Sequence, residues 1–189
     1  MDSVLIVSNT NTTLGIISDM LQSQMFTRIM TMQNGAEARR TLISDDFDVI
    51  IIDTPLPDEF GDDFALYASE QTNAGIILIV KTDMLQEIAG VVEDAGVFTL
   101  PKPVSPDFFY QAVKLLTASR RRVMTLEDEN EKLQKKIAEI RLVDRAKCGL
   151  IQYLNMTEPQ AHRYIEKQAM DLRQSRTLTA ENILKTYER

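Results

Sequence analysis

Short apolar runs that alternate with helical patterns are the feature that most constrains how this chain folds. Within residues 1–118, the runs rich in β-branched residues fall at 4–7, 28–32, 49–52, 76–80 and 97–100. The first, third and fourth are apolar almost without interruption, as is typical of parallel strands buried on both faces. Helical patterns follow the runs, near 12–24, 35–45, 60–71, 84–95 and 105–118. The alternation predicts an α/β doubly wound fold with a five-stranded parallel sheet.

After residue 118 the strand pattern stops and a long helix is predicted. Residues 119–154 contain no proline and a single glycine. Heptad spacing predicts a short coiled-coil seam made of Val123, Leu126, Asn130, Leu133, Ile137 and Ile140. An asparagine in such a seam lowers stability but favours two parallel strands. We therefore expect a homodimer joined through residues 119–142; the alternative is an amphipathic helix that packs on its own chain.

Two further helices are predicted at the end of the chain. Thr157 and Gln160 have the spacing of a capping box, which marks the start of one helix. The last helix is expected to start near Thr177 or Thr179. With the end of the long helix, these segments predict a small three-helix all-α domain over residues 143–189.

Charge divides the chain into an acidic and a basic part. Residues 1–118 hold 6 Lys/Arg against 17 Asp/Glu, and residues 119–189 hold 15 against 11. Such an asymmetry suggests separate roles for the two parts. One cysteine excludes an intrachain disulfide framework, and a single histidine leaves little for a transition-metal site. No apolar run approaches the roughly 20 residues that span a bilayer, so we expect a cytoplasmic protein without membrane contacts.

Two motifs of the acidic part resemble a known family. Asp53 ends the third run, with Pro57 four residues on and Gly61 eight residues on. Lys102 precedes a proline after the fifth run. Residues 1–118 thereby resemble the receiver domain of two-component response regulators, which implies that the doubly wound sheet is of the flavodoxin-like type. The resemblance implies that Asp53 is the candidate phosphoacceptor, that Lys102 contacts the phosphoryl group, that Mg²⁺ offsets its charge, and that a sensor kinase or regulatory protein is a partner.

Several positions depart from the receiver pattern. Ser8 and Asn9 stand where the family has an acidic pair, and Val80 and Thr99 occupy the two switch positions. Mg²⁺ prefers carboxylate ligands, so we expect at most a weak site at Asp53 and Asn9, and no cofactor. Two interpretations remain. Either Asp53 is weakly phosphorylated, or Asp53 and Lys102 form a structural ion pair in a pseudo-receiver. We favour the second.

The basic part resembles the ANTAR domain of transcription antitermination regulators over residues from about 126 to 187. The matching segments are Asp144 to Leu150, Met156 to Glu158, Ala161, Gln168 to Asp171, and Leu178. The resemblance implies a dimer that binds tandem hairpins in a nascent transcript, holds a terminator structure off and lets polymerase continue.

Candidate RNA-binding residues are the basic side chains Arg145, Lys147, Arg163, Lys167, Arg173 and Arg176. Basic groups of this kind neutralise phosphates, and arginine stacks on unpaired bases. Two alternatives stay open, a DNA-binding response regulator and a phospho-independent signalling scaffold. No Gly-rich phosphate loop or His-based triad is present, so we do not expect an enzyme, and no catalytic residue is assigned.

Overall fold

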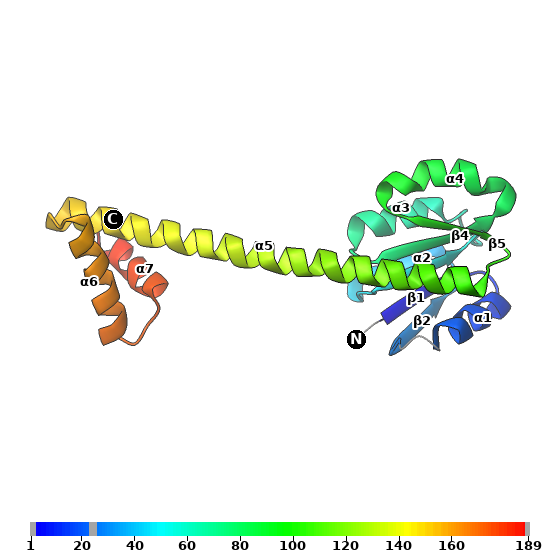
Figure 1. Ribbon diagram of the computed structural model, residues 1–189, viewed down its shortest axis with the longest axis horizontal. Helices are drawn as coiled ribbons and strands as arrows, with labels where there is room; N and C mark the ends of the chain where they lie inside the picture. The colour runs from blue at the N-terminus through cyan, green and yellow to red at the C-terminus, as the bar shows by residue number, and fades with distance from the viewer. Residues whose placement is uncertain (1–2, 23–25, 188–189) are drawn as a thin grey trace. The chain divides into compact units, whose positions relative to one another are not determined.

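A computed structural model describes residues 3–22 and 26–187 of the chain. One parallel sheet has the strand order β2-β1-β3-β4-β5, which confirms the predicted doubly wound fold (Figure 1). Its strands are β1 (Ser3–Ser8), β2 (Arg28–Met32), β3 (Val49–Asp53), β4 (Gly75–Lys81) and β5 (Phe98–Lys102).

Helices cover both faces of the sheet. The helices on the sheet are α1 (Asn11–Gln22), α2 (Gly35–Ser44), α3 (Asp62–Gln71), α4 (Leu85–Val92) and the start of α5 (Pro106–Leu154). Helices α6 (Glu158–Asp171) and α7 (Arg176–Tyr187) follow at the end of the chain. The predicted helix over 84–95 is shorter than expected, because 3-10 turns at Thr82–Met84 and Glu93–Ala95 flank α4. The last two residues of the expected helix over 12–24 lie outside the described residues.

The continuous apolar character of the central strands follows from two cores, one on each face. Alternate residues of β1, such as Leu5 and Val7, enter a core with α2, α3 and α4. Their neighbours Val4 and Ile6 enter a second core with α1 and the start of α5. All four side chains are fully buried. Because side chains alternate across a strand, burial on both faces favours apolar residues at successive positions.

Helix α5 runs through the border between two structural units. The chain divides into residues 1–125 and 126–189, so the predicted boundaries at 118 and 142 both fall inside one helix. Every residue from 121 to 141 is exposed. Across the part of the chain that is described, no helix is both long and apolar enough to cross a membrane.

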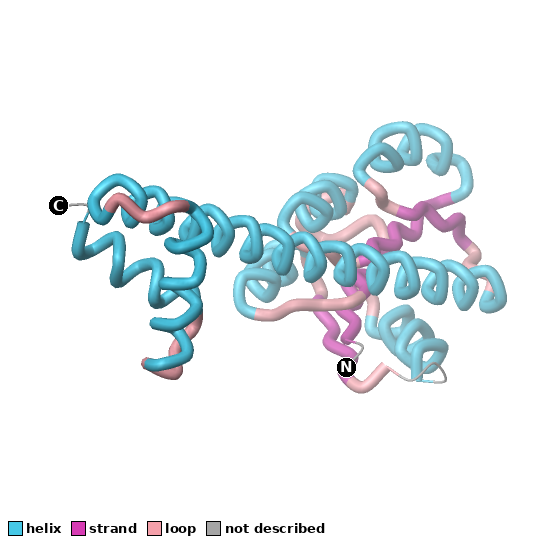
Figure 2. The backbone as a smooth tube through the Cα atoms, turned by 60° about the vertical axis from the view of Figure 1, so that its left-hand side comes forward, coloured by secondary structure: helices cyan, strands magenta, loops and turns pink. Residues whose placement is uncertain are grey.

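The C-terminal unit is built from the end of α5 with α6 and α7 (Figure 2). Its buried core consists of Ala146, Leu150, Ala161, Ile165, Ala180, Ile183 and Leu184. The predicted capping box is present, since Gln160 Oε1 accepts from the Thr157 backbone N–H at 2.8 Å. Helix α7 begins at Arg176, earlier than predicted, because the Ser175 hydroxyl accepts from the Leu178 N–H at 3.1 Å.

Substitution of Ile165 by alanine tests this small core. Ile165 is 1% exposed, and truncation of a buried isoleucine destabilises a protein by about 2–5 kcal/mol. We expect Ile165→Ala to remove the hydrogen-exchange protection of α6 and α7 and to leave that of β1 and β3 unchanged. The exposed Lys167→Ala change on the same helix serves as control. Unchanged protection of α6 in Ile165→Ala would show that the core lies elsewhere.

Candidate functional sites

The side chain of Asp53 lies at the carboxyl end of β3, where Ser8 of β1 is its neighbour in register. Asp53 is 4% exposed. The Ser8 hydroxyl donates to Asp53 Oδ2 at 2.8 Å, and Lys102 Nζ lies 2.5 Å from Oδ1. Lys102 also donates to the Thr54 carbonyl. Both carboxylate oxygens of Asp53 are therefore engaged by the chain itself.

The donor set around Asp53 does not fit Mg²⁺. Asn9 directs its amide N–H to the Pro55 carbonyl at 2.9 Å, and the two residues at the end of β1, Ser8 and Asn9, carry no carboxylate. The described residues hold no group of three or more metal-ligating side chains. Magnesium prefers several oxygen ligands in near-octahedral geometry. A lone carboxylate already paired with lysine and serine does not supply that arrangement.

Two threonine hydroxyls that the sequence pattern does not single out make hydrogen bonds at the carboxyl end of the sheet. Val80, at the first switch position, is fully buried in the sheet core, and Thr99 is half-buried in β5. Instead, buried Thr54 donates to the Ile79 carbonyl at 3.0 Å, and Thr82 donates to the Lys102 carbonyl at 2.6 Å. These bonds connect the loops after β3, β4 and β5. The bond between Lys102 and the next proline is cis, as is Thr54–Pro55.

The loop after Asp53 is fastened to helix α2. The Asp58 carboxylate accepts from the backbone N–H groups of Gly35 and Ala36 at 3.0 and 2.9 Å. The hydrogen bond from Gly35 is the main cause that holds the pKa of Asp58 below its usual range. Glu59 forms an ion pair with Arg39 of α2. The loop that follows the candidate phosphoacceptor is therefore held at its far end by long-range polar contacts.

The basic residues of α6 and its following turn lie on the surface. Arg163 and Lys167, one turn apart, are exposed opposite the buried Ala161 and Ile165. Arg173 lies in the turn after α6, exposed and with a positive φ of 50°. The surface of α6 and the turn after it thus presents exposed cations.

Arg176 begins α7, and its side chain is 63% exposed. Its Nη1 lies 3.5 Å from Glu166 Oε1 on α6. Helices α6 and α7 thereby meet at an exposed pair of opposite charges.

Lys147 differs from the other candidate cations. Its Nζ lies 2.8 Å from Asp144 Oδ1 and 2.9 Å from Glu158 Oε1, and 17% of its side chain is exposed. Asp144, and then Glu158, raise the pKa of Lys147. The ammonium group thus joins α5 to the first turn of α6. Arg145, two residues before it, is exposed on α5.

The predicted coiled-coil seam lies along the exposed stretch of α5. Its apolar members are 43–61% exposed: Val123, Leu126, Leu133, Ile137 and Ile140. Asn130 is exposed among them. Nothing within the described chain covers this stripe, so its burial requires another molecule.

Comparison with known proteins assigns a family to each unit. Residues 4–114 match the response regulator receiver domain and residues 131–184 the ANTAR domain. A curated relative is the transcriptional regulatory protein PdtaR of Mycobacterium tuberculosis. It is 29% identical over 172 residues, which cover 90% of this chain and 83% of that protein.

Solved structures of similar fold match the N-terminal part. An adenylate cyclase from Rhodopirellula baltica has a TM-score of 0.63 at 21% identity, over 69% of this chain and 98% of that one. A CheY-like receiver domain protein from Methanospirillum hungatei JF-1 has a TM-score of 0.59 at 18% identity, over 65% and 98%. At these identities the likeness shows the fold alone.

Chemical labelling with acetyl phosphate tests the Asp53 site. With millimolar Mg²⁺, we expect slow and substoichiometric labelling, because the site lacks the carboxylates that hold the metal. Asn9→Asp adds one carboxylate at the sheet edge and should increase labelling, while Asp53→Asn sets the background. Labelling is read by intact mass under conditions that preserve acyl phosphates. Rapid stoichiometric phosphorylation of the unmodified protein would contradict this view of the site.

Proposed function

The chain belongs to the response regulators that join a receiver domain to an ANTAR domain, and from this premise we propose a transcription antitermination regulator that binds hairpin RNA as a homodimer. The observation that carries the proposal is the exposed set of cations on α6 and the following turn, within the matched ANTAR domain. Basic side chains on one surface neutralise the phosphates of a nucleic acid.

Folded RNA suits this surface better than a DNA groove. Residues 141–189 carry 9 Lys/Arg and 6 Asp/Glu, a modest excess for a groove-binding helix. Glu166 and Asp171 lie on α6 beside the cations, where they would oppose insertion into a major groove. RNA hairpins expose unpaired bases as well as phosphates, and proteins bind such loops with a few cations and short-range contacts. A DNA-binding regulator remains the second candidate, and a preference for duplex DNA would favour it.

Dimerisation through α5 is the second element of the proposal. The exposed apolar stripe from Leu126 to Ile140 has the heptad spacing of a two-stranded coiled coil. Two parallel α5 helices would bury this stripe, with Asn130 paired across the seam. A parallel pair also carries two ANTAR domains, which fits a target made of two hairpins.

Control by the receiver domain is proposed to be independent of phosphorylation. Asp53 is already paired with Lys102 and with the Ser8 hydroxyl, so a partner protein or small ligand on the receiver would supply the signal. In this proposal the protein is not an enzyme. If the dimer forms but binds no nucleic acid, the chain acts as a signalling scaffold.

Substitution in the seam tests the dimer. We expect the wild-type protein to have twice the 21.5 kDa mass of the chain at micromolar concentration. Leu133→Glu places a charge in the seam and should produce monomers, because a charge buried without a partner is strongly unfavourable. Lys132→Glu, a neighbouring charge change outside the seam, is the control. Masses come from sedimentation equilibrium; a monomeric wild type, or a dimeric Leu133→Glu, would contradict the coiled coil.

Salt dependence tests the RNA surface. The Arg163→Gln/Lys167→Gln variant should bind a tandem-hairpin RNA more weakly than wild type. The slope of log affinity against log salt concentration should be shallower for this variant, by about one for each phosphate contact that is lost. Lys185→Gln, an exposed lysine of α7 outside the proposed set, is the matched control. Equal slopes for wild type and the double variant would remove these two residues from the interface.

A further inference from the structure

Arg120 fastens α5 to the rest of the receiver domain. Its side chain is 12% exposed, and its guanidinium forms an ion pair with the carboxylate of Asp48, the residue before β3. Arg120 Nε also donates to the Asn73 carbonyl at 3.1 Å. These two partners lie in the segments that lead into β3 and β4. One arginine of α5 is therefore bonded to two loops at the amino end of the sheet.

The Asp48 carboxylate is held in place by the strands themselves. The backbone N–H and the hydroxyl of Ser3 donate to Asp48 Oδ2 at 2.6 and 3.1 Å, while Arg120 pairs with Oδ1. The Asp48 backbone N–H donates to the Ser3 carbonyl at 2.8 Å, and the Asp48 carbonyl accepts from the Gly75 N–H at 3.0 Å. The sheet thus orients this carboxylate, and Arg120 is its partner from α5.

Close packing and a small pocket accompany the ion pair. A Cβ atom at Gly75 would lie 2.8 Å from the Cβ of Leu116, so the glycine allows α5 to approach the start of β4 this closely. Beside this contact, Ser119, Arg120 and Val123 line an open pocket of about 240 Å³. An α-helix with its side chains is about 10 Å across, so this pocket does not admit a second helix next to Ser119.

The stripe of α5 that packs on the receiver is the stripe that forms the seam farther along. One heptad before Val123 is Leu116, and one heptad before that is Phe109. Phe109 is buried in the sheet core, and Leu116 packs against it. Ser119 likewise stands one heptad before Leu126. Because a side chain cannot face the sheet and a partner helix at once, docking on the receiver and pairing with a second copy compete for this part of α5.

We propose that the Arg120–Asp48 ion pair is a latch that sets where the seam between two copies begins; the inference rests on the proposed dimer. With the latch closed, α5 stays on the receiver as far as Arg120, and two copies pair from Val123 onward. With the latch open, the turn around Ser119 leaves the loop before β4, and the seam extends toward the receiver by up to one heptad.

The place of the latch gives it a regulatory role that does not involve phosphorylation. Asp48 and Asp53 lie at opposite ends of β3. A partner protein that binds at the amino end of the sheet can therefore shift the latch without any change at Asp53. The length of the seam, and with it the stability of the dimer, then responds to that partner.

Amide hydrogen exchange of the full-length protein tests the latch itself. Arg120→Gln should speed the exchange of residues 116–125 by about 10-fold or more, as expected when a hydrogen bond to a charged group is lost. The centre of β3 should change much less. Arg122→Gln, the same substitution at an exposed position two residues on, is the matched control. Equal exchange of residues 116–125 in wild type and Arg120→Gln would overturn the latch.

Disulfide formation between copies tests where the seam begins. All variants carry Cys148→Ser, which removes the one native thiol. Leu126→Cys lies in the seam beyond the latch and should give an interchain disulfide under mild oxidation, because seam residues of two parallel helices face each other. Ser119→Cys should crosslink several-fold less. Addition of Arg120→Gln should raise its yield toward that of Leu126→Cys, whereas addition of Arg122→Gln should not.

The outcomes separate the latch from the dimer on which it acts. An equal yield of crosslinked Ser119→Cys with and without Arg120→Gln would overturn the inference. Absence of an interchain disulfide in Leu126→Cys would instead contradict the proposed parallel dimer, and hydrogen exchange would still test the ion pair in that case. The two failures are therefore distinguishable.

Discussion

Helix α5 is the constraint on which both structural units depend, because its side chains belong to two separate cores. Phe109 and Ala112 are buried beneath the sheet, while Ala146 and Leu150 are buried against α6 and α7. Between these segments, residues 121–141 are exposed. The hydrogen bonds within a single isolated helix contribute little to its stability. Its middle part therefore depends on continuity with both cores and, in our account, on a second copy along the seam.

The fold could be predicted because hydrophobic periodicity is a local signal. The run at 49–52 is apolar on both faces, and the structure buries it on both faces. Polar contacts between residues that lie far apart in the sequence produce no such local pattern, so they were not predicted. Asp58 looks like an ordinary loop residue in the sequence, yet it accepts hydrogen bonds from the start of α2. The start of α7 is a local case that the prediction missed: Ser175 caps the helix three residues before Leu178, so the helix starts earlier than Thr177.

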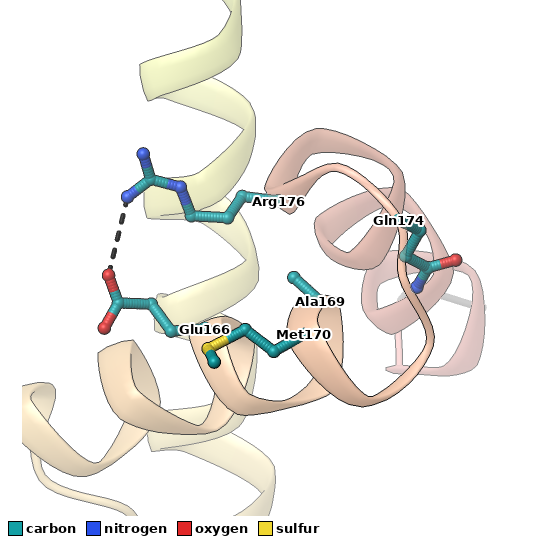
Figure 3. Close-up of a pocket in the computed structure, with 5 residues that line it drawn as sticks. All are labelled: Glu166, Ala169, Met170, Gln174 and Arg176. Carbon is teal, nitrogen blue, oxygen red and sulfur yellow. Dashed lines mark ion pairs between the residues drawn. The ribbon is translucent and has the colours of Figure 1, made fainter.

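The sequence predicts which residues belong to the candidate sites, and the structure adds the hydrogen-bond and ion-pair partners of those residues. The resemblance to the receiver family picks out Asp53 and Lys102, but a sequence cannot show that the Ser8 hydroxyl donates to the second carboxylate oxygen. Lys147 was grouped with the other cations, although two carboxylates hold it between α5 and α6. The hollow lined by Glu166, Met170 and Arg176 (Figure 3) was not predicted, although Arg176 is a candidate RNA-binding residue, because its lining comes from two helices and the turn between them.

The central claim is that two α5 helices present paired ANTAR domains to one folded RNA. The number of protein chains bound per RNA in solution tests this claim most directly. Native mass spectrometry of the full-length protein with a tandem-hairpin RNA measures it without labels. The account predicts two chains per RNA, and a single hairpin of the pair should bind much more weakly than the tandem. One chain per RNA, with equal affinity for the single and the tandem hairpin, would contradict it.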